Sequence, residues 1–139
     1  MVRIIALSEY SSDPPDGSGR VKIPTEDGQQ LYSLERVQAL VKDEQRLSLW
    51  TRKCQQDVHK LFDSDLERVA ELIQALRKDG YIDSEWCENG KGAWAACDAY
   101  RIRRLETIPV TGKSMTVEYF VKFAVGKTGR LVLLVSCHL

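Results

Sequence analysis

The C-terminal stretch "YFVKFAVGKTGRLVLLVSCHL", residues 119–139, decides the fold class. Two apolar runs flank a short turn that contains glycine, which predicts an antiparallel pair of strands. Successive side chains of a strand point to opposite faces, so Phe120 and Lys122 share one face of the first run, and Ser136 and His138 share one face of the second. A hairpin this apolar needs cover on one face. Its polar side chains therefore either face solvent without a specific function or form a functional surface on a rigid sheet.

Helical patterns come before this hairpin. Residues 33–44 begin with Ser33 as a plausible N-cap, residues 51–62 carry an apolar stripe, and residues 64–80 combine a capping-box pattern at Ser64 and Glu67 with a stop at Gly80. A short strand is expected at 46–50. Alternating or apolar runs then predict strands at 81–87, 94–106, 116–125 and 130–139. Helices first and a sheet after predict an α+β fold, with helices packed on one face of a small, mainly antiparallel sheet.

The N-terminal segment has a different composition. Residues 11–30 contain three prolines, three glycines and several Ser and Asp residues, which disfavour regular structure. Residues 1–7 could add an edge strand. We therefore expect residues 1–30 to be an N-terminal extension with a flexible arm, and residues 31–139 to form the functional domain.

Composition bounds the class of protein. The chain has 139 residues with zero formal net charge, which suits one domain and argues against a protein that coats nucleic acid. No apolar run approaches the roughly 20 residues of a membrane helix, and no secretory signal is apparent, so a cytoplasmic protein is expected. The four cysteines lack C-x-x-C spacing and are expected to be unpaired thiols. The Cys54-x4-His59 spacing matches no trusted zinc pattern, so no metal and no cofactor are expected.

Charge is unevenly distributed. Residues 99–139 hold seven basic and two acidic residues, whereas residues 71–98 hold three basic and six acidic. A local basic sheet suits a site for one or two phosphates, although Lys and Arg that protect a sheet edge from aggregation would give the same pattern. In the strand at 94–106, Cys97, Arg101 and Arg103 share one face. The simplest arrangement of these strands brings six side chains together on the open face of the sheet, as a cationic platform: Cys97, Arg101, Phe120, Lys122, Ser136 and His138.

Such a platform could cleave RNA without a metal. Attack of a 2′-hydroxyl on the adjacent phosphate needs a base, a cation for the phosphate charge and an acid for the leaving oxygen. His138 can serve as base or acid near neutral pH, and Lys122 and Arg101 can stabilise the phosphate. Phe120 or Tyr119 can stack on a base. A histidine near a chain end and a lysine within a strand are also common without any function.

The order of elements and several short motifs resemble the MqsR family of bacterial toxins. The matching stretches are "RVQALVKDEQRLSL", "GYIDSEW", "WAACDAYRI" and the C-terminal hairpin, which together span the chain from about Ser33 to Leu139. The resemblance implies a RelE-like α+β fold, a sequence-specific mRNA interferase activity and a cognate antitoxin as partner, with DNA contacted only through the antitoxin.

The resemblance also implies site positions. The family's catalytic residues fall on Asp83, Cys97, Phe120 (or, shifted by one, Tyr119) and His138, and Lys122 and Tyr100 match directly. Where the family has lysine, this chain has Asp83, which would repel phosphate. We therefore expect His138, Lys122, Arg101 and Tyr119 to be catalytic. Four residues are expected to bind substrate: Phe120, Tyr100, Cys97 and Arg103.

Two alternatives stay open at this point. One is a non-catalytic module of the same fold that holds a protein partner, which Asp83, Cys97 and the zero net charge favour. The other is a DNA-binding regulator, which is weaker because no candidate recognition helix carries a basic surface.

Overall fold

The computed structural model describes residues 5–10, 21–25, 28–107 and 110–139. Within these residues it contains three α-helices, α1 (Leu34–Leu40), α2 (Arg52–Phe62) and α3 (Leu66–Gln74). The strands are β1 (Ile5–Ala6), β2 (Val21–Lys22), β3 (Leu47–Leu49), β4 (Tyr81–Glu88), β5 (Ala93–Thr107), β6 (Ser114–Val125) and β7 (Val132–His138). The α+β prediction is confirmed, and the strands predicted after residue 80 all form.

One mixed sheet holds the described strands together. Its order is β2-β4-β5-β6-β7-β3, and β1 pairs with β5 beside that path. The pairs β4–β5, β5–β6 and β6–β7 are antiparallel, whereas the short strands β1 and β3 run parallel to their partners. The long central strands thus form an antiparallel meander, as short connections between neighbouring strands require.

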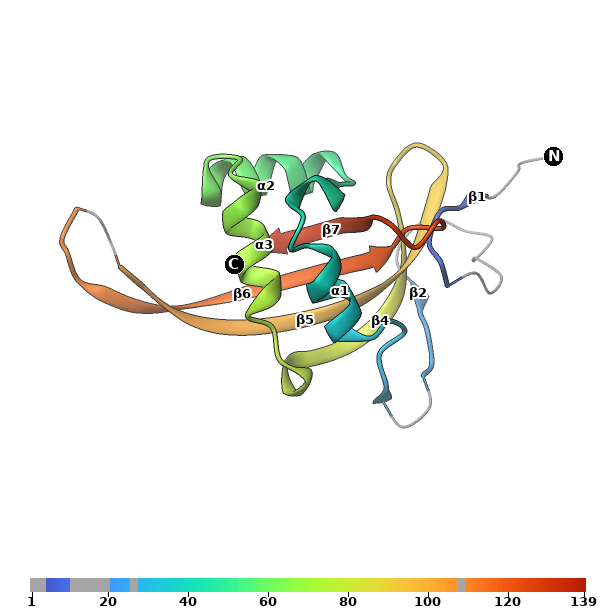
Figure 1. Cartoon of the computed structure of the whole chain (residues 1–139), viewed down its shortest axis with the longest axis horizontal. Coiled ribbons are helices and arrows are strands. Elements are labelled where there is room, and N and C mark those ends of the chain that lie inside the picture. Colours follow the sequence, from blue (N-terminus) through green and yellow to red (C-terminus); the bar gives the residue numbers. More distant parts are fainter. Residues whose placement is uncertain (1–4, 11–20, 26–27, 108–109) are drawn as a thin grey trace.

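The three helices lie over one face of this sheet (Figure 1). Alternation in β6 sends Tyr119, Val121 and Phe123 to that face, where all three are buried in the main hydrophobic core. The ring of Tyr119 stacks on Phe62 of α2 with centroids 5.8 Å apart. The neighbouring residues Phe120 and Lys122 therefore lie on the opposite face, which the helices leave uncovered.

Helix starts follow local hydrogen bonding. Ser33 and Thr51 accept from the backbone N–H three residues later and cap α1 and α2, as such hydroxyls commonly do. The capping box predicted at Ser64 is wrong, because Asp63 and Ser64 adopt positive φ in the turn after α2. Asp65 instead caps α3, through the backbone N–H of Glu67. That helix ends at Gln74 rather than near Gly80, and a 3₁₀ turn at Lys78–Gly80 leads into β4.

The described parts of the N-terminal segment are integrated into the fold. Strand β1 extends the sheet beside β5, and β2 pairs with β4 through Val21 and Trp86. A second buried cluster forms here from Ile23, Trp86, Trp94 and Ala96. Strand β1 lies within residues 1–7, where the sequence allows an edge strand. Of the arm expected at 11–30, residues 11–20 and 26–27 lie outside the described residues, and the described part includes the short strand β2, which was not predicted.

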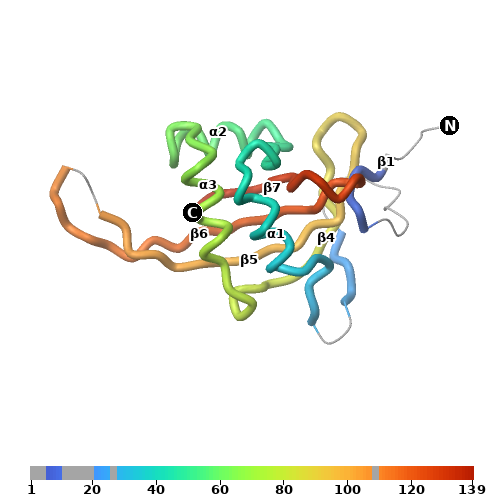
Figure 2. The backbone as a smooth tube through the Cα atoms, in the orientation of Figure 1, coloured from blue at the N-terminus to red at the C-terminus, as the bar shows by residue number. Residues whose placement is uncertain are grey.

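Strands β5 and β6 form a long hairpin whose end extends beyond the helices (Figures 1 and 2). Near that end, Leu105 is 73% exposed. The paired register runs without interruption from Thr107↔Ser114 back to Asp98↔Phe123. This continuous ladder holds the residues of the uncovered face in fixed rows.

Candidate functional site

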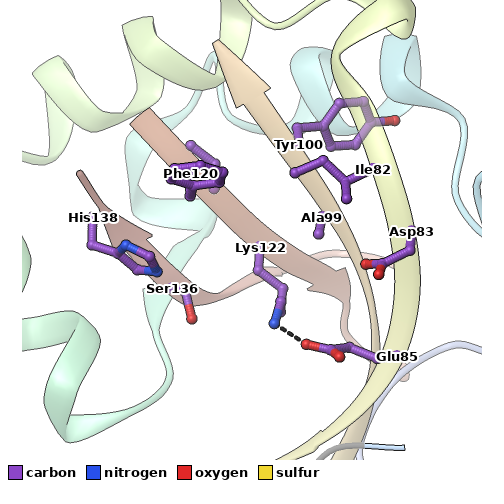
Figure 3. Close-up of a pocket in the computed structure, with 10 residues that line it drawn as sticks. Ile82, Asp83, Glu85, Ala99, Tyr100, Phe120, Lys122, Ser136 and His138 are labelled. Atoms are coloured by element: carbon purple, nitrogen blue, oxygen red, sulfur yellow. Dashed lines mark hydrogen bonds and ion pairs between the residues drawn. The ribbon is translucent and has the colours of Figure 1, made fainter. Parts of the chain in front are cut away.

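Three neighbouring strands place polar side chains in rows across the uncovered face. In one row Lys122 of β6 lies opposite Ala99 of β5 and Ser136 of β7, and in the next Phe120 lies opposite His138. Residues directly opposite in an antiparallel pair have Cβ atoms about 5 Å apart on the same face. The rows surround a cavity of about 320 Å³ whose lining includes Phe120, Lys122, Ser136 and His138 (Figure 3).

Lys122 points across the cavity to Glu85 of β4 and forms an ion pair with it (Figure 3). Both side chains are only 11% exposed. Removing two charges from water is costly, and close pairing offsets that cost. Glu85 therefore fixes the position of the Lys122 ammonium at the cavity wall.

A second carboxylate lies next to this pair. Asp83 precedes Glu85 by two residues in β4, lines the same cavity, and accepts a hydrogen bond from Lys22 at 2.6 Å. The platform predicted as cationic therefore also carries two carboxylates, Asp83 and Glu85. Asp83 and Glu85 reach this face because β4 is the neighbour of β5 and turns its acidic positions to it.

His138 is the titratable group at the other side of the cavity. Its ring stacks on Phe120 with centroids 5.8 Å apart and an interplanar angle of 27°. Its Nδ1 lies 3.0 Å from the carbonyl oxygen of Leu139. The other ring nitrogen, Nε2, makes no hydrogen bond to a described residue, so a ligand can approach it.

Arg101 and Arg103 lie just outside this cavity. Arg101 is directly opposite Phe120, in the same row as His138, and lines an adjoining depression of about 320 Å³. Arg103 lines that depression too, and its Nε donates to Glu118 at 2.8 Å. The structure thus brings the two arginines onto the expected face, but next to the cavity rather than within it.

Two predicted site residues, Tyr119 and Cys97, do not line the cavity, whereas a third, Tyr100, is among its lining residues although it is fully buried. Tyr119 is on the helix face, where its hydroxyl donates to Glu106 at 3.3 Å. Cys97 lies opposite Glu85 on the uncovered face and is fully buried. Burial raises its pKa well above the usual thiol value, as does the neighbouring Cys87 thiol. Tyr100 is also fully buried, stacked on Phe123 at 5.5 Å, and its hydroxyl finds no hydrogen-bond partner among the described residues.

A buried carboxylate anchors β4 and β5 on the helix side. Asp98 accepts hydrogen bonds from the backbone N–H groups of Leu31 and Tyr32 and from the hydroxyl of Ser84, at 2.6–3.0 Å. Burial raises the pKa of Asp98 more than these three hydrogen bonds lower it. Ser84 lies between Asp83 and Glu85 in β4, so its hydrogen bond to Asp98 fixes the position of this part of β4 at the cavity.

Sequence reasoning did not select Glu85. The available signal was the alternation of Asp83 and Glu85 in "YIDSEW", which puts both carboxylates on one face of β4. The cation that pairs with Glu85 could not be predicted from the sequence, because Lys122 is 37 residues away from Glu85 in the chain.

No metal site is seen in the part of the chain that the structure describes. It contains no group of three or more His, Cys, Asp or Glu side chains arranged to hold a metal ion. All four cysteines are buried, and none joins another in a disulfide. No described helix has the length and apolar character needed to span a membrane.

Comparisons with protein-family models, with curated proteins and with solved structures find no match to this chain.

Proposed function

We propose that the cavity between β4, β6 and β7 binds single-stranded RNA and cleaves it by attack of a 2′-hydroxyl, without a metal. One observation carries the proposal. A carboxylate, an ammonium and an imidazole, from Glu85, Lys122 and His138, line one open cavity that also presents the aromatic ring of Phe120. These groups supply the base, the charge stabilisation and the acid that the reaction needs.

The reaction divides between the two sides of the cavity. Glu85 takes the proton of the 2′-hydroxyl as the 2′-oxygen bonds to phosphorus. The Lys122 ammonium stabilises the added negative charge on the phosphate oxygens. The phosphorus–5′-oxygen bond then breaks, and the imidazolium of His138 gives its proton to the departing 5′-oxygen. The products are a 2′,3′-cyclic phosphate and a 5′-hydroxyl, so all atoms and protons are accounted for.

The Lys122–Glu85 pair ties two of these roles together. A bound phosphate and Glu85 compete for the same ammonium, so substrate binding draws Lys122 partly away from the carboxylate. A carboxylate whose negative charge is less neutralised by a nearby cation is a better base. The stacked ring of Phe120 next to His138 offers a surface for the base of the nucleotide being cleaved.

The biological setting that we propose rests on the resemblance to the MqsR family. In this proposal the protein is a cytoplasmic mRNA interferase toxin of a type II toxin–antitoxin system, held inactive by a cognate antitoxin protein. The departures at Asp83, Cys97, Phe120 and His138 imply that the chemistry is distributed differently here, with Glu85 and His138 as the acid–base pair.

Cleavage of a mixed-sequence RNA by purified protein in EDTA tests the proposal. His138→Ala should abolish cleavage, whereas His59→Ala should cleave like the wild type, because His59 lies on α2 and hydrogen-bonds Ser64. The two variants remove the same side chain from the only two histidine positions of the chain. Equal activity of wild type and His138→Ala would refute the assignment of His138.

A second function is favoured by a different observation. Lys122 is already neutralised by Glu85, and Asp83 adds a further carboxylate beside the cavity. The same face could then hold a protein partner without cleaving RNA. This candidate predicts no cleavage at any protein concentration, so metal-independent cleavage that is lost in His138→Ala would eliminate it.

A further inference from the structure

A row of three side chains crosses the uncovered face beside the cavity. Arg101, Phe120 and His138 are consecutive cross-strand partners on β5, β6 and β7. Neighbouring strands lie about 4.8 Å apart, so the guanidinium-bearing strand is roughly 10 Å from the strand of His138. The row therefore presents a cation, an aromatic ring and an imidazole in that order.

At the Arg101 end, the depression has a cation that pairs with no carboxylate of the described residues. Arg77 pairs with Asp79 at 3.7 Å, and Arg103 pairs with Glu118 at 2.8 Å, and all four of these residues line the depression. Among the described residues Arg101 forms no ion pair, and its side chain is exposed. Its five N–H donors are therefore available to a ligand, and phosphate oxygens match their planar geometry.

We propose that this depression is a second phosphate subsite for the single-stranded RNA that enters the cavity. The phosphate next to the reacting one binds Arg101, and the base between the two phosphates stacks on Phe120. An aromatic ring between two cationic positions is the pattern with which proteins track single strands, since every base has a face that can stack. This inference rests on the proposed function, which identifies the ligand as RNA. It adds the path of the RNA across the strands, from the cavity toward Arg101.

Binding of an RNA that cannot be cleaved isolates the subsite from the chemistry. The probe is a fluorescein-labelled oligonucleotide with 2′-O-methyl groups throughout, which lacks the attacking hydroxyl, and the readout is fluorescence anisotropy. Arg101→Ala should weaken binding roughly tenfold, the loss typical of a hydrogen bond to a charged group. The slope of log K against log salt concentration should fall by about 0.7, the value for one phosphate contact on a single strand.

Arg104→Ala is the matched control. Arg104 is three residues further along β5, so it faces the helix side, where it lies near the hydroxyl of Tyr119. This variant loses the same charge and should bind within twofold of the wild type. Arg101→Lys should retain most of the salt slope and lose part of the affinity, because lysine keeps the charge without the planar donor pair.

The outcomes separate this inference from the proposed function. Equal binding by Arg101→Ala and the wild type, an equal loss in Arg104→Ala, or no RNA binding by the wild type would overturn the subsite. Arg101-dependent binding supports the subsite whether or not the protein cleaves RNA. Cleavage that depends on His138 with no binding contribution from Arg101 would retain the endoribonuclease and remove the subsite.

Discussion

The ion pair between Lys122 and Glu85 makes a quantitative prediction about stability. Each side chain is 11% exposed, so removing Lys122 leaves a largely desolvated carboxylate without its close cation. Breaking a buried pair from one side typically costs 3–5 kcal/mol. We expect Lys122→Met to lower the free energy of unfolding by about 3 kcal/mol, at the lower end of that range, because the cavity is open to solvent.

The double variant Lys122→Met/Glu85→Leu should recover most of this loss. Two apolar side chains of similar size need no charge compensation, so we expect it to unfold within about 1 kcal/mol of the wild type. Urea denaturation of the wild type, both single variants and the double variant closes a thermodynamic cycle. The coupling energy should exceed about 2 kcal/mol. The double variant should also be folded and unable to cleave RNA, which separates the fold from the activity.

The Lys22–Asp83 pair serves as the control in the same assay. Its lysine side chain is 75% exposed and its aspartate 28%, and exposed pairs contribute little to stability. Lys22→Met should therefore change the unfolding free energy by no more than about 0.5 kcal/mol. If Lys122→Met costs as little as Lys22→Met, or if the two single changes in the cycle simply add, the argument that Glu85 and Lys122 are a buried pair is refuted.

Three further predictions concern the support of the site. Tyr100→Phe removes a buried hydroxyl that has no hydrogen-bond partner among the described residues, so it should leave stability unchanged or raise it by up to about 1 kcal/mol. Tyr32→Phe removes a hydroxyl that donates to the Ala96 carbonyl at 2.6 Å and should cost about 1 kcal/mol. Thermal unfolding compares the two variants. The pKa of Asp98 is raised in the folded protein, so its contribution to the free energy of unfolding is full below the unfolded pKa and is lost as pH rises through the folded pKa. The stability of the wild type relative to Asp98→Asn should therefore fall from pH 3 to pH 7. An increase over this range would contradict the prediction. Asp65→Ala should cost about 1 kcal/mol because it removes the cap of α3, and a larger cost from Ser64→Ala would contradict the observed cap.

Local patterns predicted most of the fold. The strands from β4 to β7 follow from alternation and turn residues, and the helices follow from apolar stripes with a hydroxyl or carboxylate before each. The errors lie at boundaries. Ser64 and Asp65 are both good caps, and only the positive φ of Asp63 and Ser64 decides between them. No sequence pattern specifies that turn geometry.

The site was predictable only within each strand. Alternation placed Phe120 with Lys122, and Ser136 with His138, and the structure brings these four together. It also indicated that Tyr119 belongs with Val121 on the other face, and only the resemblance kept that residue among the catalytic candidates. What joins one strand to the next is the register, and the irregularity between Lys122 and Phe123 in the β6–β7 pairing is invisible in the sequence. The partnership of Lys122 with Glu85 depends on two other registers, those of β5 with β6 and of β4 with β5.

We propose that this cavity cleaves RNA through the 2′-hydroxyl. The most direct measurement uses an RNA that the wild type cleaves in EDTA, compared with the same RNA carrying one 2′-deoxy nucleotide on the 5′ side of the cleaved bond, with the product ends identified by mass spectrometry. The account predicts 2′,3′-cyclic phosphate and 5′-hydroxyl ends from the all-ribose RNA, and no cleavage at the deoxy position. Equal cleavage of both substrates, or no cleavage of any RNA, would contradict it.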